Sequence, residues 1–213
     1  MEDKHVLLAQ DDLENMKITR LKRTEIAKGT IITYCHDTIK APNGHICDYD
    51  FIRHQGAAAV LPIMDDGRIL LVRQYRNAID RFALEVPAGG LDGPDEPTID
   101  AAKRELAEEA GYESDDISFL VSIYPTVAYG NEKIDIYLAK GLKKVKRDLD
   151  PDEYINVEAW DLDELAKLIF EGKIQDAKTV SAVRRSATRK AVDQAMDCCC
   201  AEISEDYAKR HKK

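Results

Sequence analysis

Residues 89–112, GGLDGPDEPTIDAAKRELAEEAGY, constrain the fold of this chain more than any other segment. Pro97 suits the first position of a helix, and Gly111 suits the position just past its end. Four apolar residues between them recur at helical spacing and are predicted to face the core. These residues are Ile99, Ala102, Leu106 and Ala110. The segment therefore predicts an amphipathic helix behind a glycine-rich turn.

The predicted helix carries three glutamates on one face, because Glu105, Glu108 and Glu109 stand at i, i+3 and i+4. Three like charges so close repel one another, which costs stability in a solvated helix. A hard cation such as Mg²⁺ or Mn²⁺ removes that cost, since it prefers oxygen ligands. With Lys103 and Arg104 nearby, the acids also fit an ordinary surface helix. The spacing alone leaves a metal site and a solvated acidic face both open.

A second pair of charges is predicted to brace the glycine-rich loop. Glu96 lies just ahead of the helix, and the loop that contains Gly90 can fold it back. Arg104 is expected to point away from the centre of the three glutamates and to pair with Glu96. Such a pair would fix the loop on the helix.

The rest of the chain alternates between strand and helix patterns. TIITYCHDTIK and HICDYDFIRH flank the turn Pro42-Asn43-Gly44, which predicts a hairpin within residues 17–53. Residues 57–64 form a continuous apolar run, typical of a strand buried on both faces. Further strands are expected at 68–76, 117–124, 133–142 and 155–160, and further helices at 161–174 and 176–196. The pattern, without an internal repeat or a Gly/Ser-rich linker, predicts one α/β domain.

The composition limits the class of protein. The 213 residues are 44% hydrophobic and carry a net charge of -9, which argues against a nucleic-acid-binding surface. No apolar run reaches the length of a membrane span, and the acidic start lacks the features of a signal peptide. We therefore expect a cytoplasmic protein with no membrane partner. The five cysteines include the run Cys198-Cys199-Cys200, which does not fit a disulfide framework.

The full register of the acidic stretch adds a stronger signal than helical spacing. Gly90, Glu96 and the run Arg-Glu-Leu-Ala-Glu-Glu-Ala-Gly at 104–111 resemble the Nudix box, the 23-residue loop–helix–loop signature of the Nudix hydrolase family. Tyr112 at the final aliphatic position is a common relaxation of that signature. The resemblance covers most of residues 17–190. Its Val-Arg-Gln-Tyr-Arg and Glu-Val-Pro-Ala-Gly segments look like those of ADP-ribose pyrophosphatases and related nucleoside-diphosphate-sugar hydrolases.

The resemblance implies an α/β Nudix fold, a mixed β-sheet in an α/β/α sandwich with an N-terminal β-hairpin region. Residues 1–53 would be an N-terminal segment whose strands pair across a two-fold axis, so a homodimer is expected. Residues 54–190 would be the Nudix hydrolase domain. Residues 191–213 would be a C-terminal extension.

The implied activity is metal-dependent hydrolysis of the diphosphate bond of ADP-ribose, giving AMP and ribose 5-phosphate. Relatives that act on ADP-ribose tend to carry a Pro-Gly pair where this chain has Val127 and Ala128. GDP-mannose or another nucleotide sugar therefore stays an alternative substrate. A Nudix-fold sensor that binds such a nucleoside diphosphate derivative without cleaving it is a further alternative.

The resemblance also implies a metal site for Mg²⁺ or Mn²⁺. Glu105 and Glu109 would be the principal ligands, with Glu108 ligating or sharing. A main-chain carbonyl of the preceding turn usually joins them. Relatives have one glycine in that turn and this chain has two, so the carbonyl is that of Ala88 or Gly89.

Catalysis and substrate binding are assigned by the same resemblance. Glu153 lies at the position of the base that activates water, with Asp152 as the second choice and a solvated turn as the plain alternative. Arg53 and Arg76 match positions that bind the diphosphate or the terminal ribose. Glu85 matches an acid that helps to orient the site. The implied catalytic set is Glu153, Glu108 and Arg104.

Overall fold

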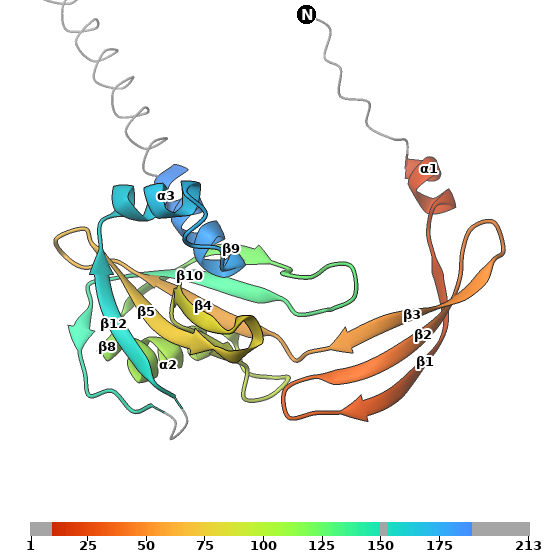
Figure 1. The fold of residues 1–213 in the computed structure, drawn as a ribbon, viewed down its shortest axis with the longest axis horizontal. Helices are drawn as coiled ribbons and strands as arrows, with labels where there is room; N and C mark the ends of the chain where they lie inside the picture. Colours follow the sequence, from red (N-terminus) through yellow and green to blue (C-terminus); the bar gives the residue numbers. More distant parts are fainter. Residues whose placement is uncertain (1–9, 150–152, 189–213) are drawn as a thin grey trace, which may run out of the picture. The chain divides into compact units, whose positions relative to one another are not determined.

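The computed structural model describes residues 10–149 and 153–188, which form two compact units (Figure 1). The N-terminal unit comprises the residues up to 55 together with 126–132. The central unit comprises residues 56–125 and those from 133 onward. The division lies two residues after the boundary expected from the sequence, and it assigns the loop 126–132 to the N-terminal unit. Residues 191–213, including the cysteine run, lie outside the described residues.

The N-terminal unit is an antiparallel sheet preceded by a short helix, α1 (Gln10–Asn15). Its strands are β1 (Thr19–Lys28), β2 (Thr33–Lys40) and β3 (Ile46–Arg53), in the order β1-β2-β3. The predicted hairpin is confirmed, because β2 and β3 pair from Thr33↔Arg53 to Lys40↔Ile46. Gly44 takes a left-handed φ of 86° in the turn between them. The loop 126–132 attaches to β3, where the amide of Ile52 donates to the carbonyl of Tyr129.

The central unit is built on two sheets. A mixed sheet has the order β7-β4-β10-β9, and an antiparallel sheet has the order β12-β5-β6. Strands β4 and β10 run parallel, and the other neighbours in the mixed sheet are antiparallel. The bounds are β4 (Ala57–Pro62), β5 (Ile69–Arg76), β6 (Arg81–Glu85), β7 (Ala88–Gly90), β9 (Asp116–Ile123), β10 (Ile134–Lys140) and β12 (Ile155–Trp160). Minor elements are the 3₁₀ turn η1 (Asn77–Ile79) and the pair β8 (Tyr112–Glu113) and β11 (Lys143–Lys144).

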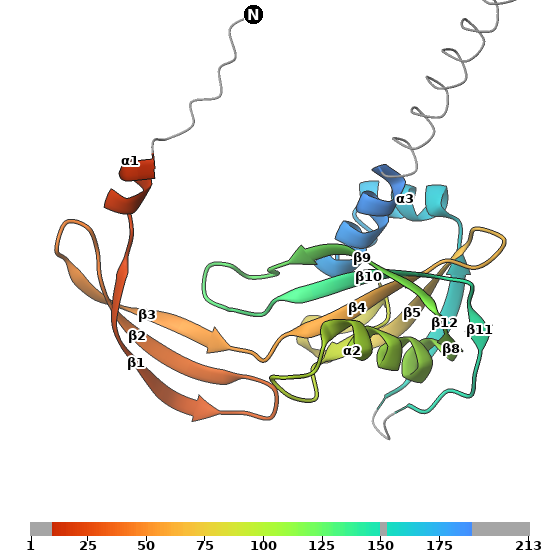
Figure 2. The same cartoon turned by 180° about the vertical axis from the view of Figure 1, so that it is seen from behind.

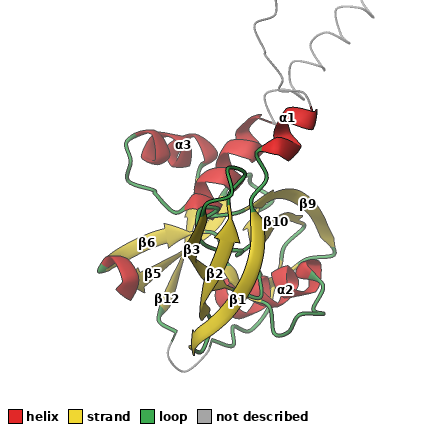
Figure 3. Cartoon of the chain, turned by 90° about the vertical axis from the view of Figure 1, so that its right-hand side faces the viewer, coloured by secondary structure: helices red, strands yellow, loops and turns green. Residues whose placement is uncertain are grey.

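Helices cover both faces of the mixed sheet (Figure 2 and Figure 3). One face carries α2 (Thr98–Glu105) and its continuation η2 (Leu106–Ala110). The other carries α3 (Leu162–Phe170) and the helical residues 177–188. The remainder of the helix expected at 176–196 lies outside the described residues. The predicted α/β/α sandwich is therefore confirmed. Among residues 10–149 and 153–188, no helix is long and apolar enough to span a bilayer.

Strand β4 explains why both faces need a helix, because all six of its residues are buried. Alternate side chains of a strand point to opposite faces, so a continuous apolar run must be covered twice. The cluster on the α2 side comprises Ala58, Val60, Ala101, Ala102, Leu106, Ala110, Tyr137 and Ala139. The cluster on the other side includes Ala57, Ala59, Leu61, Leu165, Ala182 and Val183.

The helix behind the glycine-rich turn differs from the prediction in two details. Pro97 takes the N-cap position with an extended ψ of 129°, so the helix begins at Thr98, one residue later than predicted. The last five residues, Leu106–Ala110, widen into a π-helix before Gly111 ends the helix with a φ of 75°. Such widened turns are frequent at functional sites, because they shift side chains relative to a regular helix.

Candidate metal centre

Two of the three helix glutamates are buried against strand β7. Glu105 is 6% exposed and Glu109 is 2% exposed. The carboxylate of Glu109 accepts a hydrogen bond from the main-chain amide of Ala88, with 2.8 Å between nitrogen and Oε2. A buried carboxylate is costly unless a charge or hydrogen bond compensates it. This burial separates Glu105 and Glu109 from ordinary surface acids.

Gly89 lies in direct contact with the carboxylate of Glu105. A Cβ atom on Gly89 would stand 2.0 Å from Oε1 of Glu105, whereas a Cβ on Gly90 would have no atom within 4 Å. A side chain at position 89 would force the carboxylate of Glu105 to leave its present place. The carboxylates of Glu105 and Glu109 thus lie against the main chain of β7, and carboxylate oxygens are ligands that suit a hard cation.

Arg104 lies among the glutamates and does not point away from them as the sequence suggested. Its Nη1 donates to Oε1 of Glu105 at 2.6 Å and to Oε2 of Glu108 at 3.1 Å. Its Nη2 donates to the carbonyl of Gly90 at 3.0 Å, and its Nε lies 3.4 Å from Oε1 of Glu96. The guanidinium thus joins the loop to the helix, and it also gathers two of the three acids. Helical geometry alone suggested that Arg104 points away from the glutamates. Attraction between its guanidinium and the carboxylates of Glu105 and Glu108 outweighs this tendency.

The three glutamates do not converge on a single point. Within residues 10–149 and 153–188, no group of three His, Cys, Asp or Glu side chains is placed to surround a metal ion. Glu105 and Glu108 converge on Arg104, and Glu109 turns to the amide of Ala88. The residues fit a cation in donor type and burial. Binding would require Glu105 and Glu108 to exchange a guanidinium for the ion.

Burial sets the electrostatics of this site. Desolvation raises the pKa of Glu105 to about 7, although Arg104 opposes the rise. Desolvation also raises the pKa of Glu109 to about 8, and repulsion by Glu105 adds to the effect. The negative charge of Glu153 contributes to the raised pKa of both residues. The interior therefore disfavours the accumulated negative charge, and a bound cation would compensate it.

Glu153 is half-buried and precedes strand β12. Its negative charge helps to raise the pKa of Glu105 and of Glu109. The residue expected to act as base therefore interacts electrostatically with both proposed metal ligands. Asp152, the second choice for the base, lies outside the described residues.

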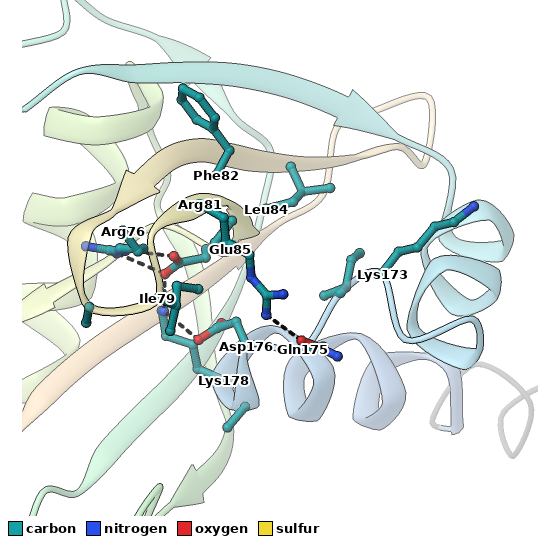
Figure 4. Close-up of a pocket in the computed structure, with 14 residues that line it drawn as sticks. Arg76, Ile79, Arg81, Phe82, Leu84, Glu85, Lys173, Gln175, Asp176 and Lys178 are labelled. Atoms are coloured by element: carbon teal, nitrogen blue, oxygen red, sulfur yellow. Dashed lines mark hydrogen bonds and ion pairs between the residues drawn. The ribbon is translucent and has the colours of Figure 1, made fainter.

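Arg76 and Glu85 form a second charged cluster, shown in Figure 4. Arg76 donates from Nε and Nη2 to the two oxygens of Glu85, at 2.7 and 2.9 Å. Lys178, from the helical residues 177–188, also donates to Glu85 and lies 3.0 Å from Oδ1 of Asp176. Burial raises the pKa of Glu85, but hydrogen bonds from Arg76 and the charge of Lys178 prevail and lower it to about 2. The charge of Glu109 helps to raise the pKa of Arg76, so the two clusters interact.

Sequence reasoning missed Lys178 and Asp176. Both lie in residues 171–183, EGKIQDAKTVSAV, where no motif or spacing points to a site residue. Beside the cluster is a cavity of about 550 Å³. Three of its four lining cations form ion pairs within the protein: Arg76 with Glu85, Lys178 with Glu85 and Asp176, and Lys173 with Glu171.

Glu85→Gln should reduce the acid sensitivity of folding. The pKa of Glu85 is about 2 in the folded protein against an ordinary 4.5, so its ionised form stabilises the fold above pH 4.5 and that contribution is lost as the pH falls toward 2. The difference corresponds to on the order of 3 kcal/mol of unfolding free energy. Urea unfolding should show that Glu85→Gln has a lower free energy of unfolding than the wild type at pH 7. This difference in free energy should be smaller at pH 3. A difference of equal size at both pH values would contradict this assignment.

Arg53 belongs to the N-terminal unit. Its Nη1 lies 3.2 Å from Oε2 of Glu25, and its Nη2 donates to Sγ of Cys35 at 3.5 Å. Both partners lie within that unit. The substrate-binding role expected for Arg53 therefore stays a prediction.

Comparisons with known proteins identify a domain family and relatives that the chain resembles. A model of the NUDIX domain matches residues 53–183. The chain is 35% identical to a methanol dehydrogenase activator of Bacillus methanolicus, over 81% of this chain and 94% of that protein. It is 30% identical to an ADP-ribose pyrophosphatase of Bacillus subtilis (strain 168), over 84% and 98% of the two chains. The crystal structure of an ADP compounds hydrolase is similar with a TM-score of 0.72 and 26% identity, covering 84% of this chain and 96% of that one.

Proposed function

The chain belongs to the Nudix family, and on that premise we propose that it hydrolyses the diphosphate bond of ADP-ribose to AMP and ribose 5-phosphate. The observation that carries the proposal is the pair of buried carboxylates, Glu105 and Glu109, held against the main chain of β7. The names of two relatives, an ADP-ribose pyrophosphatase and an ADP compounds hydrolase, support the choice of substrate.

Mg²⁺ or Mn²⁺ would be held by Glu105 and Glu109, with Glu108 ligating or sharing. The main-chain carbonyl of Ala88 or Gly89 would complete the protein's contribution. A cation held by these residues would supply positive charge for the phosphate oxygens and would favour attack by water. The protein's part is to hold these carboxylates against β7 in a partly dry site, where Glu105 and Glu108 would exchange Arg104 for the cation.

Arg76 is proposed to bind a phosphate of the substrate. Glu85 accepts hydrogen bonds from two of its guanidinium nitrogens, which fixes the plane of the group. A guanidinium carries five N–H donors, so donors remain for phosphate oxygens. Glu85 thereby orients Arg76, and Lys178 offsets part of the negative charge of Glu85.

Glu153 is proposed as the base that accepts a proton from the attacking water. Glu153→Gln should lower kcat by about 10² to 10⁴-fold, the usual contribution of a general base, while thermal stability stays near that of the wild type. Glu164→Gln, an exposed acid of α3, is the matched control and should be neutral. A Glu153→Gln variant that keeps most of its kcat would exclude Glu153 as the base.

A substrate panel with Mg²⁺ tests the proposed function. ADP-ribose, GDP-mannose and further nucleotide sugars would be incubated with the full chain and the products separated by chromatography. We expect AMP and ribose 5-phosphate from ADP-ribose, with the highest kcat/KM of the panel. A higher kcat/KM for GDP-mannose would show that the protein is a hydrolase whose preferred substrate is GDP-mannose and not ADP-ribose. Tight binding with no turnover of any compound would favour the sensor alternative.

We also propose that the protein is a cytoplasmic homodimer that pairs through its N-terminal unit. That unit exposes several large apolar side chains, which are costly in water and are often covered by a partner. They include Leu21, Ile26, Ile31 and Ile46. A molar mass measured in solution at twice 24.0 kDa would support the pairing, and a monomer at micromolar concentration would exclude it.

A further inference from the structure

Thr179 connects the helical residues 177–188 to the segment that leads into β7. Its side chain is 0% exposed. The main-chain amide of Val86 donates to Oγ1 of Thr179 at 2.8 Å, and this hydroxyl donates to Oδ2 of Asp176 at 2.6 Å. Oδ2 of Asp176 also accepts from the main-chain amide of Thr179 at 2.9 Å. The hydroxyl therefore has one acceptor role and one donor role, both in use within the protein.

The anchored amide lies two residues before the main chain that meets the glutamates. Pro87 has no N–H, so the amides of Val86 and Ala88 are the donors available along this segment. The first bonds to Thr179 and the second bonds to Glu109. The carbonyl of Pro87 accepts from the amide of Val60 in β4 at 3.0 Å. The segment is thus held between the helical residues 177–188, strand β4 and the candidate metal ligand Glu109.

We propose that Thr179 is a positioning residue for the metal centre. Its hydroxyl sets the path of residues 86–89, and this path fixes both the amide that orients Glu109 and the carbonyl available to a cation. The proposal rests on the proposed function. It gives the helical residues 177–188 a second contact with the site besides Lys178. It also explains why a fully buried position holds a threonine where valine would fill the same volume. A buried hydroxyl is costly unless its hydrogen bonds matter, because desolvation is compensated only by those bonds.

The test compares Thr179→Val, which removes the hydroxyl at similar volume, with Thr179→Ser, which keeps it. Thr188→Val, on the exposed side of the same helix, is the matched control. Binding of Mn²⁺ to the full chain without substrate is followed by the electron paramagnetic resonance signal of the free ion. Loss of a hydrogen bond that orients a metal ligand typically weakens metal binding by about 10 to 100-fold, and we expect at least tenfold weaker binding for Thr179→Val. The serine and control variants should bind within about threefold of the wild type, because each keeps the hydroxyl at position 179.

Kinetics and thermal unfolding separate positioning from stability. Thr179→Val should need more Mg²⁺ for half-maximal rate, with an unchanged KM for the substrate at saturating Mg²⁺. A lower melting temperature with wild-type Mn²⁺ affinity would overturn the inference and leave Thr179 a structural residue. If the valine variant fails to fold, Thr179→Cys retains the volume with a much weaker hydrogen-bonding group, and the same comparison applies. Absence of Mn²⁺ binding in the wild type would overturn the proposed function and this inference together.

Discussion

Glu109→Gln should lower the rate of hydrolysis by about three orders of magnitude while the protein stays folded. The change removes one negative charge from the proposed metal ligands, and a bound cation contributes several kcal/mol to such reactions, with each 1.36 kcal/mol worth tenfold in rate. Glutamine keeps the volume, and its carbonyl oxygen can still accept the hydrogen bond from Ala88. The loss should therefore appear in kcat/KM and in Mn²⁺ affinity, not in the fold.

Stability should move in the opposite direction from activity. Burial raises the pKa of Glu109 to about 8, above its ordinary value of 4.5. The folded state then binds more protons than the unfolded state between these values, so the metal-free protein loses stability as the pH rises through that window. Glutamine carries no charge and removes this cost. With EDTA at pH 8, the variant should melt at a higher temperature than the wild type.

The neighbouring glutamate provides the comparison for this prediction. Glu108 has the same chemistry, but its side chain is 39% exposed and bonds to Arg104. Glu108→Gln should cost less activity than Glu109→Gln and should leave the melting temperature nearly unchanged. A near-normal rate in Glu109→Gln, measured on protein with a cooperative melting transition, would reject Glu109 as a metal ligand.

The main elements of the fold were predictable because their signals are local. The apolar run at 57–64 requires cover on both faces, and β4 is covered by α2 on one side and by α3 and residues 177–188 on the other. The spacing of Ala102, Leu106 and Ala110 identifies the buried face of the helix, and all three are buried. These signals depend on periodicity and burial, which the sequence shows directly.

The contacts that organise the site were not predictable in this way, because they join residues distant in the sequence. Thr179 lies 93 residues after Val86, and Lys178 lies 93 residues after Glu85. No spacing rule connects such pairs. The orientation of Arg104 was missed for a different reason. Helical geometry gives the direction of its Cβ, but the long side chain bends back to the nearest carboxylates.

Gly89→Ala should lower activity by at least about 100-fold, whereas Gly90→Ala should leave it nearly unchanged. A methyl group on Gly89 would lie 2.0 Å from Oε1 and 2.4 Å from Cδ of Glu105, so the carboxylate must move. Misplacement of a reacting group by about 1 Å can cost about 10²-fold in rate. A methyl group on Gly90 would have no atom within 4 Å. The carbonyl of Gly90, which accepts from Arg104, is retained in alanine.

The two alanine variants form a matched pair, because they change adjacent glycines in the same strand by the same methyl group. Rates, Mn²⁺ affinity and melting temperatures would be measured for both. Since neither glycine has a positive φ, alanine strains the backbone at neither position, and the difference between the variants reports the contact with Glu105 alone. Equal activity in the two variants would mean that Glu105 can leave this contact without harm to the site. A loss of activity in Gly89→Ala alone would mean that only the first of the two glycines is needed for activity. That glycine is the one that lets β7 approach the carboxylate of Glu105.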